Sequence, residues 1–386
     1  MRRFFVGDAA FSALNTAERH RCPGKIGVDS RKTFLLNFFA PFVRWAACSP
    51  AVLLCAAAAL VGAFGHPAAA QTGPSSSSSA ALVSPVFVLN SLDNSVSVIN
   101  PLTWQETKRI DTGKQPHHLY LTPDEKSLIV ANALSDSLTF IDPRTAEVQR
   151  TVRGILDPYH LRFSPDMKWL IVAANRLNHI DIYSWDGKDV ALAKRIATGK
   201  TPSHLWIDSK SSTAYSTMQD SNELIAIDLA SQTVKWRTKT GSIPADVFGT
   251  LDDRLLLVGL TGSDSVEVFD VSGADKAPVR VKTIRTGDGA HAFRSLGDRR
   301  HVLVSNRVAN TISKIDLQTL EVVDKFPAPG GPDCIDVSRD GKQILVTSRW
   351  SRKLTIIDIA SRKVVQQVAV GKSPHGVWTL DHAPRQ

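Results

Sequence analysis

From residue 85 onward, short apolar runs alternate with polar turns about every ten residues. The stretch 116–153 is representative. It contains the apolar runs HHLYL, SLIVAN and SLTFID, the turn segments TPDEK and PRTAE between them, and the alternating segment VQRTVRG at its end. Runs of this length, bounded by Pro, Asp and Gly, predict β-strands. Each unit therefore predicts four short strands, of which the second is buried and the last is polar.

This order of strands recurs along the chain. Its marker is a Gly, a short spacer, a Pro and an apolar strand, and the Pro position falls at residues 116, 158, 202, 244, 290 (an Ala), 332 and 374. Seven copies at intervals of 42 to 46 residues, with four strands in each, are typical of β-propeller blades.

The two ends of the repeat region are offset by one strand. The N-terminal copy, residues 85–112, lacks a first strand, and the C-terminal copy ends after one, HGVWTL at 375–380. We therefore expect an all-β, seven-bladed β-propeller of four-stranded antiparallel blades, closed by pairing that C-terminal strand with the N-terminal three strands. An open array of hairpins is the alternative, but its ends should carry atypical capping repeats.

Several second strands share a signature. FVLN (87–90), IVAN (129–132), LVSN (303–306) and LVTS (345–348) resemble the YVTN motif, and SPDM (164–167) and SRDGK (338–342) follow first strands. Over about residues 85–380 the chain resembles the YVTN/YncE-like β-propeller repeat family. The resemblance implies the fold and an exported protein, because the family is largely bacterial and exported, but no single activity. The repeats are more distantly similar to the haem-d1 propeller of periplasmic nitrite reductases.

The segment before the repeats has the order of a Sec-type signal peptide. The 14-residue apolar run 51–64 follows Arg44, and Ala68 and Ala70 supply a small-x-small cleavage signal. The run is shorter than the ~20 residues of a spanning helix, although an uncleaved anchor is the alternative. We predict a leader at 1–70 cleaved near Ala70, a Ser-rich linker at 71–84, the propeller at 85–380 and a tail at 381–386. The mature chain would be periplasmic or secreted, monomeric and without a membrane span. The long stretch before Arg44 leaves the true start codon open.

Composition bears mainly on partners. The net charge of +9 divides into +5 for residues 1–70 (8 Lys/Arg, 3 Asp/Glu) and +4 for the remainder. A body so close to neutral argues against nucleic-acid binding. Three of the four cysteines fall in the leader, so the mature chain keeps only Cys334 and cannot form an intrachain disulfide.

Two sets of polar residues should converge at one face of the ring. One set follows the Pro positions and the other ends the second strands, and antiparallel pairing brings these points together. Six of the nine histidines outside the leader belong to the first set, and we take them as candidate metal ligands: His117, His118, His160, His204, His291 and His375. The candidate ligand-binding residues are Asn90, Asn132, Asn175, Arg176, Asp246, Asn306, Arg307, Asp333, Arg349 and Trp350.

Three interpretations of the histidines stay open. They are polar strand-start groups bonded to carbonyls, or they bind a transition metal or a haem-type cofactor, or with the arginines they bind an anionic small molecule or peptide. No H-x-x-H, C-x-x-C, G-x-S-x-G or phosphate loop occurs in the body, so no catalytic residue is assigned. We interpret the protein as an exported binding or scaffold module for a small ligand or a periplasmic partner protein. The main alternative is a metal- or haem-binding oxidoreductase component, and a metal-assisted lyase or hydrolase is the second.

Overall fold

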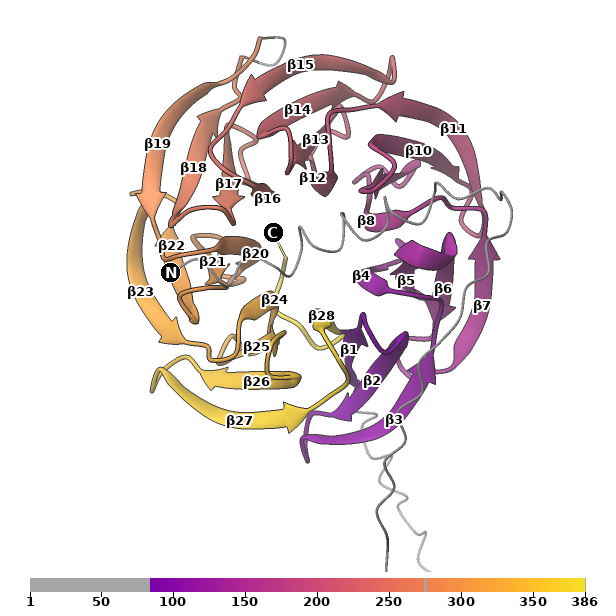
Figure 1. Cartoon of the computed structure of the whole chain (residues 1–386), viewed down its shortest axis with the longest axis vertical. Helices are drawn as coiled ribbons and strands as arrows, with labels where there is room; N and C mark the ends of the chain where they lie inside the picture. Colours follow the sequence, from indigo (N-terminus) through magenta and orange to yellow (C-terminus); the bar gives the residue numbers. More distant parts are fainter. Residues whose placement is uncertain (1–83, 274–275, 386) are drawn as a thin grey trace, which may run out of the picture. The chain divides into compact units, whose positions relative to one another are not determined.

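The computed structural model describes residues 84–273 and 276–385. Within these residues strands β1 to β28 form seven four-stranded antiparallel sheets arranged around a central axis (Figure 1). This confirms the predicted seven-bladed propeller. The predicted leader (1–70) and all of the predicted linker except Ser84 lie outside the described residues. Among the described residues, no helix is both long and apolar enough to cross a membrane.

Each blade consists of an inner, a second, a third and an outer strand. The inner strands are β4 (Pro116–Leu121), β8 (Pro158–Phe163), β12 (Pro202–Ile207), β16 (Pro244–Gly249), β20 (Ala290–Ser295), β24 (Pro332–Val337) and β28 (Pro374–Thr379). The second strands are β5 (Leu128–Asn132), β9 (Trp169–Ala174), β13 (Thr213–Met218), β17 (Leu255–Leu260), β21 (His301–Asn306), β25 (Gln343–Ser348) and β1 (Val86–Asn90). The third strands are β6 (Ser137–Ile141), β10 (His179–Trp185), β14 (Glu223–Asp228), β18 (Ser265–Asp270), β22 (Thr311–Asp316), β26 (Lys353–Asp358) and β2 (Ser95–Asn100). The outer strands are β7 (Val148–Arg153), β11 (Val190–Ala197), β15 (Thr233–Lys239), β19 (Val279–Arg285), β23 (Glu321–Pro327), β27 (Lys363–Ala369) and β3 (Gln105–Asp111).

The ring closes through the two ends of the repeat region. Strand β28 pairs antiparallel with β1, with Phe87 opposite Trp378 and Val88 opposite Val377. One sheet therefore contains β28, β1, β2 and β3, as the offset of the chain ends predicts. The pairing covers the edge of β1 that an open array would expose.

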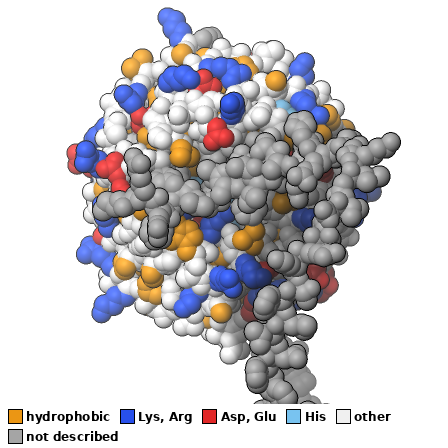
Figure 2. Space-filling view, viewed as in Figure 1, with side chains coloured by type: hydrophobic (Ala, Val, Ile, Leu, Met, Phe, Trp, Pro, Cys, Tyr) orange, Lys and Arg blue, Asp and Glu red, His pale blue; other side chains and the backbone are white. Residues whose placement is uncertain are grey.

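The core lies between the blades. Every residue of β5 and β6 is buried, whereas β7 is mostly exposed. Strands buried on both faces need apolar side chains at successive positions, which explains runs such as LIVAN. Neighbouring blades pack these faces together, as Phe87 and Leu89 pack with Leu128 and Trp378. On the face seen in Figure 2, Lys and Arg side chains are scattered and not gathered into one patch.

Acidic residues at the ends of third strands organise the outer turns. The Asp142 carboxylate accepts hydrogen bonds from the backbone N–H groups of Arg144 (2.8 Å) and Thr145 (3.0 Å). Asp228 and Asp358 accept in the same way from Ser231 and Ser361. These repeated carboxylates stabilise turns.

Each inner strand carries a β-bulge directly after its Pro position. In β4, Pro116 lies opposite Asn132 and Leu119 lies opposite Val130, so His117 and His118 together face a single residue of β5. The same irregularity occurs in all seven inner strands. A bulge interrupts strict alternation and re-aims side chains. The residues that follow each Pro position can therefore turn toward the axis of the ring.

Candidate functional site

The predicted histidines meet inside the ring, with His118 at the centre. Its ring centroid lies 4.6 Å from those of His160, His204 and His375 and 4.9 Å from that of His117. The rings of His117 and His375 are 3.7 Å apart. These five residues come from β4, β8, β12 and β28, and we call them the histidine cluster.

Four of the five histidines of the cluster are buried, and His160 is partly exposed. His118 is 8% exposed, His204 2% and His375 0%. This burial has a geometric cause, because seven strand starts converge on a narrow axis and the bulges turn their side chains inward. His291, from β20, lies at the edge of the cluster, 5.7 Å from His204 between ring centroids.

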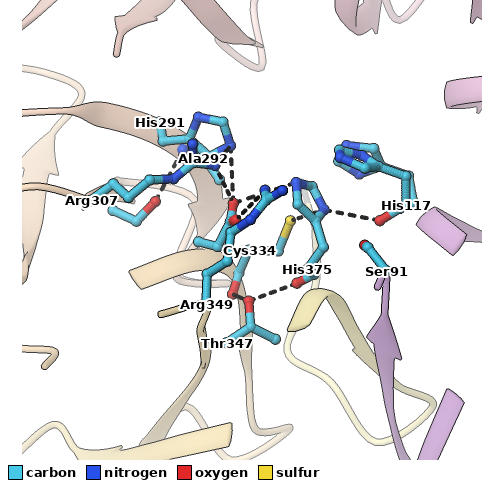
Figure 3. Close-up of polar contacts among 12 residues, drawn as sticks. Ser91, His117, His291, Ala292, Arg307, Cys334, Thr347, Arg349 and His375 are labelled. Atoms are coloured by element: carbon cyan, nitrogen blue, oxygen red, sulfur yellow. Dashed lines mark hydrogen bonds and ion pairs between the residues drawn. The ribbon is translucent and has the colours of Figure 1, made fainter. Parts of the chain in front are cut away.

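Hydrogen bonds determine which imidazole nitrogens are free. Nδ1 of His375 lies 2.9 Å from the carbonyl oxygen of His117 (Figure 3). Since a carbonyl can only accept, this Nδ1 carries the proton and Nε2 keeps its lone pair. Nε2 of His375 and the Nδ1 atoms of His117 and His160 are buried and have no hydrogen-bond partner among the described residues. Buried polar atoms are normally paired, so three such nitrogens without a hydrogen bond in one cluster are unusual.

His204 is oriented by its neighbours. Its Nε2 lies 3.0 Å from Nε2 of His118, and its Nδ1 lies 3.0 Å from Oδ1 of Asp246. The other carboxylate oxygen of Asp246 accepts the backbone N–H of Phe293 at 2.8 Å. Burial alone would raise the pKa of Asp246, but His204 and these hydrogen bonds lower it, so the carboxylate is ionised at neutral pH.

Burial keeps four imidazoles of the cluster neutral. Desolvation, together with the neighbouring imidazoles, lowers the pKa of His117, His118, His160 and His375 well below the usual value. It lowers the pKa of His291 to about 4, with Arg307 adding to the effect. At neutral pH these rings are therefore uncharged, which is the form that binds metal ions.

Beside the cluster lies a fully buried carboxylate, that of Asp333. It accepts hydrogen bonds from Nη2 of Arg307 (2.8 Å) and Nη1 of Arg349 (3.0 Å). Nε2 of His291 lies 3.0 Å from it and Nε2 of His375 lies 3.5 Å from it. Burial alone would raise the pKa of the Asp333 carboxyl, but Arg307 and the imidazoles hold it well below its usual range.

The neighbouring Cys334 is a weaker ligand candidate. Its Sγ lies 3.5 Å from Nδ1 of His375 (Figure 3). Burial and the adjacent Asp333 raise the pKa of the thiol well above its usual value. The thiol therefore stays protonated at neutral pH, whereas metal ions bind the thiolate.

A cavity of about 510 Å³ adjoins the cluster inside the ring. His118, His160 and His204 line one end of it, and turn residues such as Pro123 and Pro165 line the other. The cavity follows the inner strands between these ends, so the imidazoles form its floor.

The predicted asparagines lie elsewhere. Asn90, Asn132 and Asn306 are buried, and their amides donate to hydroxyls of the third strand, at 2.9 Å to Ser97, 2.9 Å to Thr139 and 3.0 Å to Ser313 respectively. Asn175 donates to the carbonyl oxygen of Pro202 at 2.9 Å. None of the four lines the cavity. Their contacts connect neighbouring strands.

Two further predicted residues also lie away from the cavity lining. Arg176 pairs with the buried Asp157, whose pKa burial raises to about 6 although Arg176 opposes the rise. Trp350 is 50% exposed, beside Gly331. Sequence reasoning also missed two cavity residues, Arg162 and Trp206. Each is the fourth residue after its Pro position, and that shared place is the signal that could have revealed them.

Comparisons with known proteins concern mainly the fold. A family model described as YNCE-like beta-propeller matches residues 45–385. The uncharacterized protein YncE of Salmonella typhimurium is 31% identical over 170 residues, which cover 43% of this chain and 47% of that protein. The chain thus spans about half the length of the curated relatives it matches.

Two solved structures are similar at low sequence identity. The periplasmic gluconolactonase PpgL of Pseudomonas aeruginosa gives a TM-score of 0.66 at 18% identity, over 79% of this chain and 100% of that one. Dihydro-heme d1 dehydrogenase NirN, in complex with DHE, gives a TM-score of 0.57 at 18% identity, over 77% of this chain and 75% of that one. At such identities the likeness concerns the fold alone, since one propeller fold carries many activities.

Proposed function

The chain belongs to the YNCE-like β-propeller family, and on that premise we propose that it is a binding protein whose histidine cluster takes up one copper or zinc ion. The observation that supports this most directly is a set of three buried imidazole nitrogens, on His117, His160 and His375, that have no hydrogen-bond partner among the described residues. Imidazole is a preferred ligand of both ions. The predicted leader would deliver this activity to the periplasm, the compartment named for PpgL.

His117, His118 and His375 are the proposed ligands. One ligand atom from each lies within 4.8 Å of the others. Nitrogens about 2 Å from a tetrahedral ion lie roughly 3.3 Å apart, so small ring rotations would complete the site. His160 or His204, both in contact with His118, would supply a fourth nitrogen.

A second grouping of His291, Asp333 and His375 is a poorer candidate. Nε2 of His291 lies 2.6 Å from a guanidinium nitrogen of Arg307, and its Nδ1 lies 3.0 Å from the Thr261 hydroxyl. Both nitrogens are therefore occupied. A haem-type cofactor also fits poorly, because neighbouring imidazole rings of the cluster lie 3.7 to 4.9 Å apart between centroids and contact one another, which leaves no slot for a planar macrocycle.

The binding of the ion can be tested by calorimetric titration of chelator-stripped protein with Zn²⁺ and Cu²⁺ at pH 7.5. We expect one ion per chain, and a loss of affinity of about a hundredfold when His118→Ala and His375→Ala are combined. His301→Ala is the matched control, because His301 lies outside the cluster and contacts Asp298. X-ray absorption should give three or four nitrogen ligands at about 2 Å.

Circular dichroism and the melting temperature establish that each variant is folded. A folded wild-type protein that takes up neither ion would refute the proposal. So would a folded double variant that binds as tightly as the wild type.

A further inference from the structure

Beyond the histidine cluster, a second layer of side chains lines the cavity at the fourth residue after five of the seven Pro positions. Tyr120, Arg162, Trp206 and Phe248 occupy this place in four successive blades. The Arg162 guanidinium carbon lies 4.2 Å from the ring centroid of Trp206 and 6.0 Å from that of Tyr120. The rings of Trp206 and Phe248 are 5.0 Å apart. The cavity thus has an aromatic wall with one guanidinium stacked into it.

Arg162 differs from the other arginines of the cavity because it has no carboxylate partner among the residues that the structure describes. Arg294 and Arg385 both bind the buried Asp336, each at 2.9 Å. Arg162 makes one long hydrogen bond, 3.4 Å from Nη1 to the carbonyl oxygen of Leu205. Among the described residues that line the cavity, it is the guanidinium without a counter-charge.

The carboxylate of Asp246, which also lines the cavity, does not serve Arg162. Its two oxygens are engaged by His204 and by the backbone N–H of Phe293. A partly buried cation has lost part of its hydration, and aromatic stacking compensates only part of that cost in free energy. An anion inside the cavity would compensate the rest.

We propose that this cavity binds a small aromatic carboxylate, whose carboxylate accepts from Arg162 and whose ring packs against Trp206 and Phe248. Stacking on an aromatic face leaves the in-plane N–H groups of a guanidinium available, and these match a carboxylate in a two-point contact. The cavity of about 510 Å³ has the volume of ordinary small-molecule sites. This site does not require the proposed metal ion.

The test is a calorimetric titration of the mature propeller with benzoate, the smallest ligand of this class. The titration is done in the presence of a chelator. We expect saturable binding, and binding of benzamide weaker by about tenfold or more, since the amide lacks the charge. Arg162→Gln should weaken benzoate binding by a similar factor, and Arg162→Lys should recover only part of it because Lys lacks the fork. Arg285→Gln is the control, because Arg285 lies on the outer strand β19 and is 89% exposed in its side chain.

Several outcomes would overturn the inference. These are no benzoate binding by folded protein, equal binding of benzoate and benzamide, and unchanged benzoate binding by Arg162→Gln. Inorganic phosphate binding as tightly as benzoate would refute the aromatic part of the site. The melting temperature of each variant separates loss of binding from loss of fold.

Discussion

Acidification should destabilise this protein well above the pH at which carboxylates titrate. His117, His118, His160, His375 and His291 have a lowered pKa in the fold, the last of about 4. In the unfolded chain each is free to protonate near pH 6.5. Because the histidine pKa is lower in the folded state, the unfolded chain takes up protons first as the pH falls below 6.5. The free energy of unfolding is therefore highest above pH 6.5 and decreases below it.

The size of the effect follows from these five groups. Between pH 7 and pH 5.5, protonation of the unfolded chain lowers the free energy of unfolding by about 1.2 kcal/mol for each imidazole that stays neutral in the fold. For five such imidazoles the free energy of unfolding falls by about 6 kcal/mol. Asp157 acts in the opposite direction, because its pKa is raised to about 6. Protonation of Asp157 in the folded state raises the free energy of unfolding by somewhat less than about 1 kcal/mol over the same pH range. The net loss of about 5 kcal/mol is comparable with the whole stability of many domains.

Urea unfolding of metal-free protein at pH 7.0, 6.25 and 5.5, followed by circular dichroism at constant ionic strength, measures this loss directly. The dependence of the unfolding free energy on urea should stay constant, which shows that the same surface is exposed. The combined variant His160→Gln and His375→Gln removes two of the five titrating groups, so its loss should fall to about 3 kcal/mol. A wild-type loss below about 1 kcal/mol would refute the claim that burial holds these imidazoles neutral.

Two other predictions concern the closure of the ring and the buried carboxylate. Deleting residues 372–386 removes β28 and with it the buried Trp378 and Val377, so the melting temperature should fall by about 10 °C or more; an unchanged midpoint would contradict closure through β28. Asp333→Asn removes a buried negative charge that Arg307 and Arg349 both contact and should lower the unfolding free energy by about 3–5 kcal/mol. Asp324→Asn, in an exposed pair with Arg362, should cost about 1 kcal/mol or less. Equal losses in these two variants, measured by urea unfolding, would show that burial of Asp333 has no special cost.

The fold could be predicted from the sequence because its determinants are periodic. The Pro positions mark every inner strand, and the apolar runs mark the strands that are buried on both faces. The offset of residues 85–112 and 375–380 was enough to predict closure. The C-terminal copy has an unpaired first strand and the N-terminal copy lacks one, so pairing these two ends completes a four-stranded blade.

The histidine cluster could be predicted only in part. The shared place after the Pro indicated that the imidazoles lie together. Their burial was not predictable, since it depends on bulges that displace the register in three dimensions. The asparagines show a different limit. Asn132 ends a strand at the expected level, but its side chain turns into the blade toward Thr139, seven residues later. Asn90 and Asn306 also have a hydroxyl residue seven positions later that accepts a hydrogen bond from the amide. This spacing indicates an asparagine that connects two strands, but only the structure reveals its meaning.

The bulges divide each inner strand into a part that supplies side chains to the axis and a part that packs between blades. The later residues of each inner strand pack the blades, whereas the two residues at the bulge contribute side chains to the axis and little to the cohesion of the sheets. Neighbouring blades already use these places differently, with His117 and His118 in β4, Asp246 in β16, and Asp333 and Cys334 in β24. The side chains at the axis therefore differ from one blade to the next while the strand pairing stays the same. Duplicated copies of such a propeller should acquire new ligands at these paired places before the rest of the ring changes.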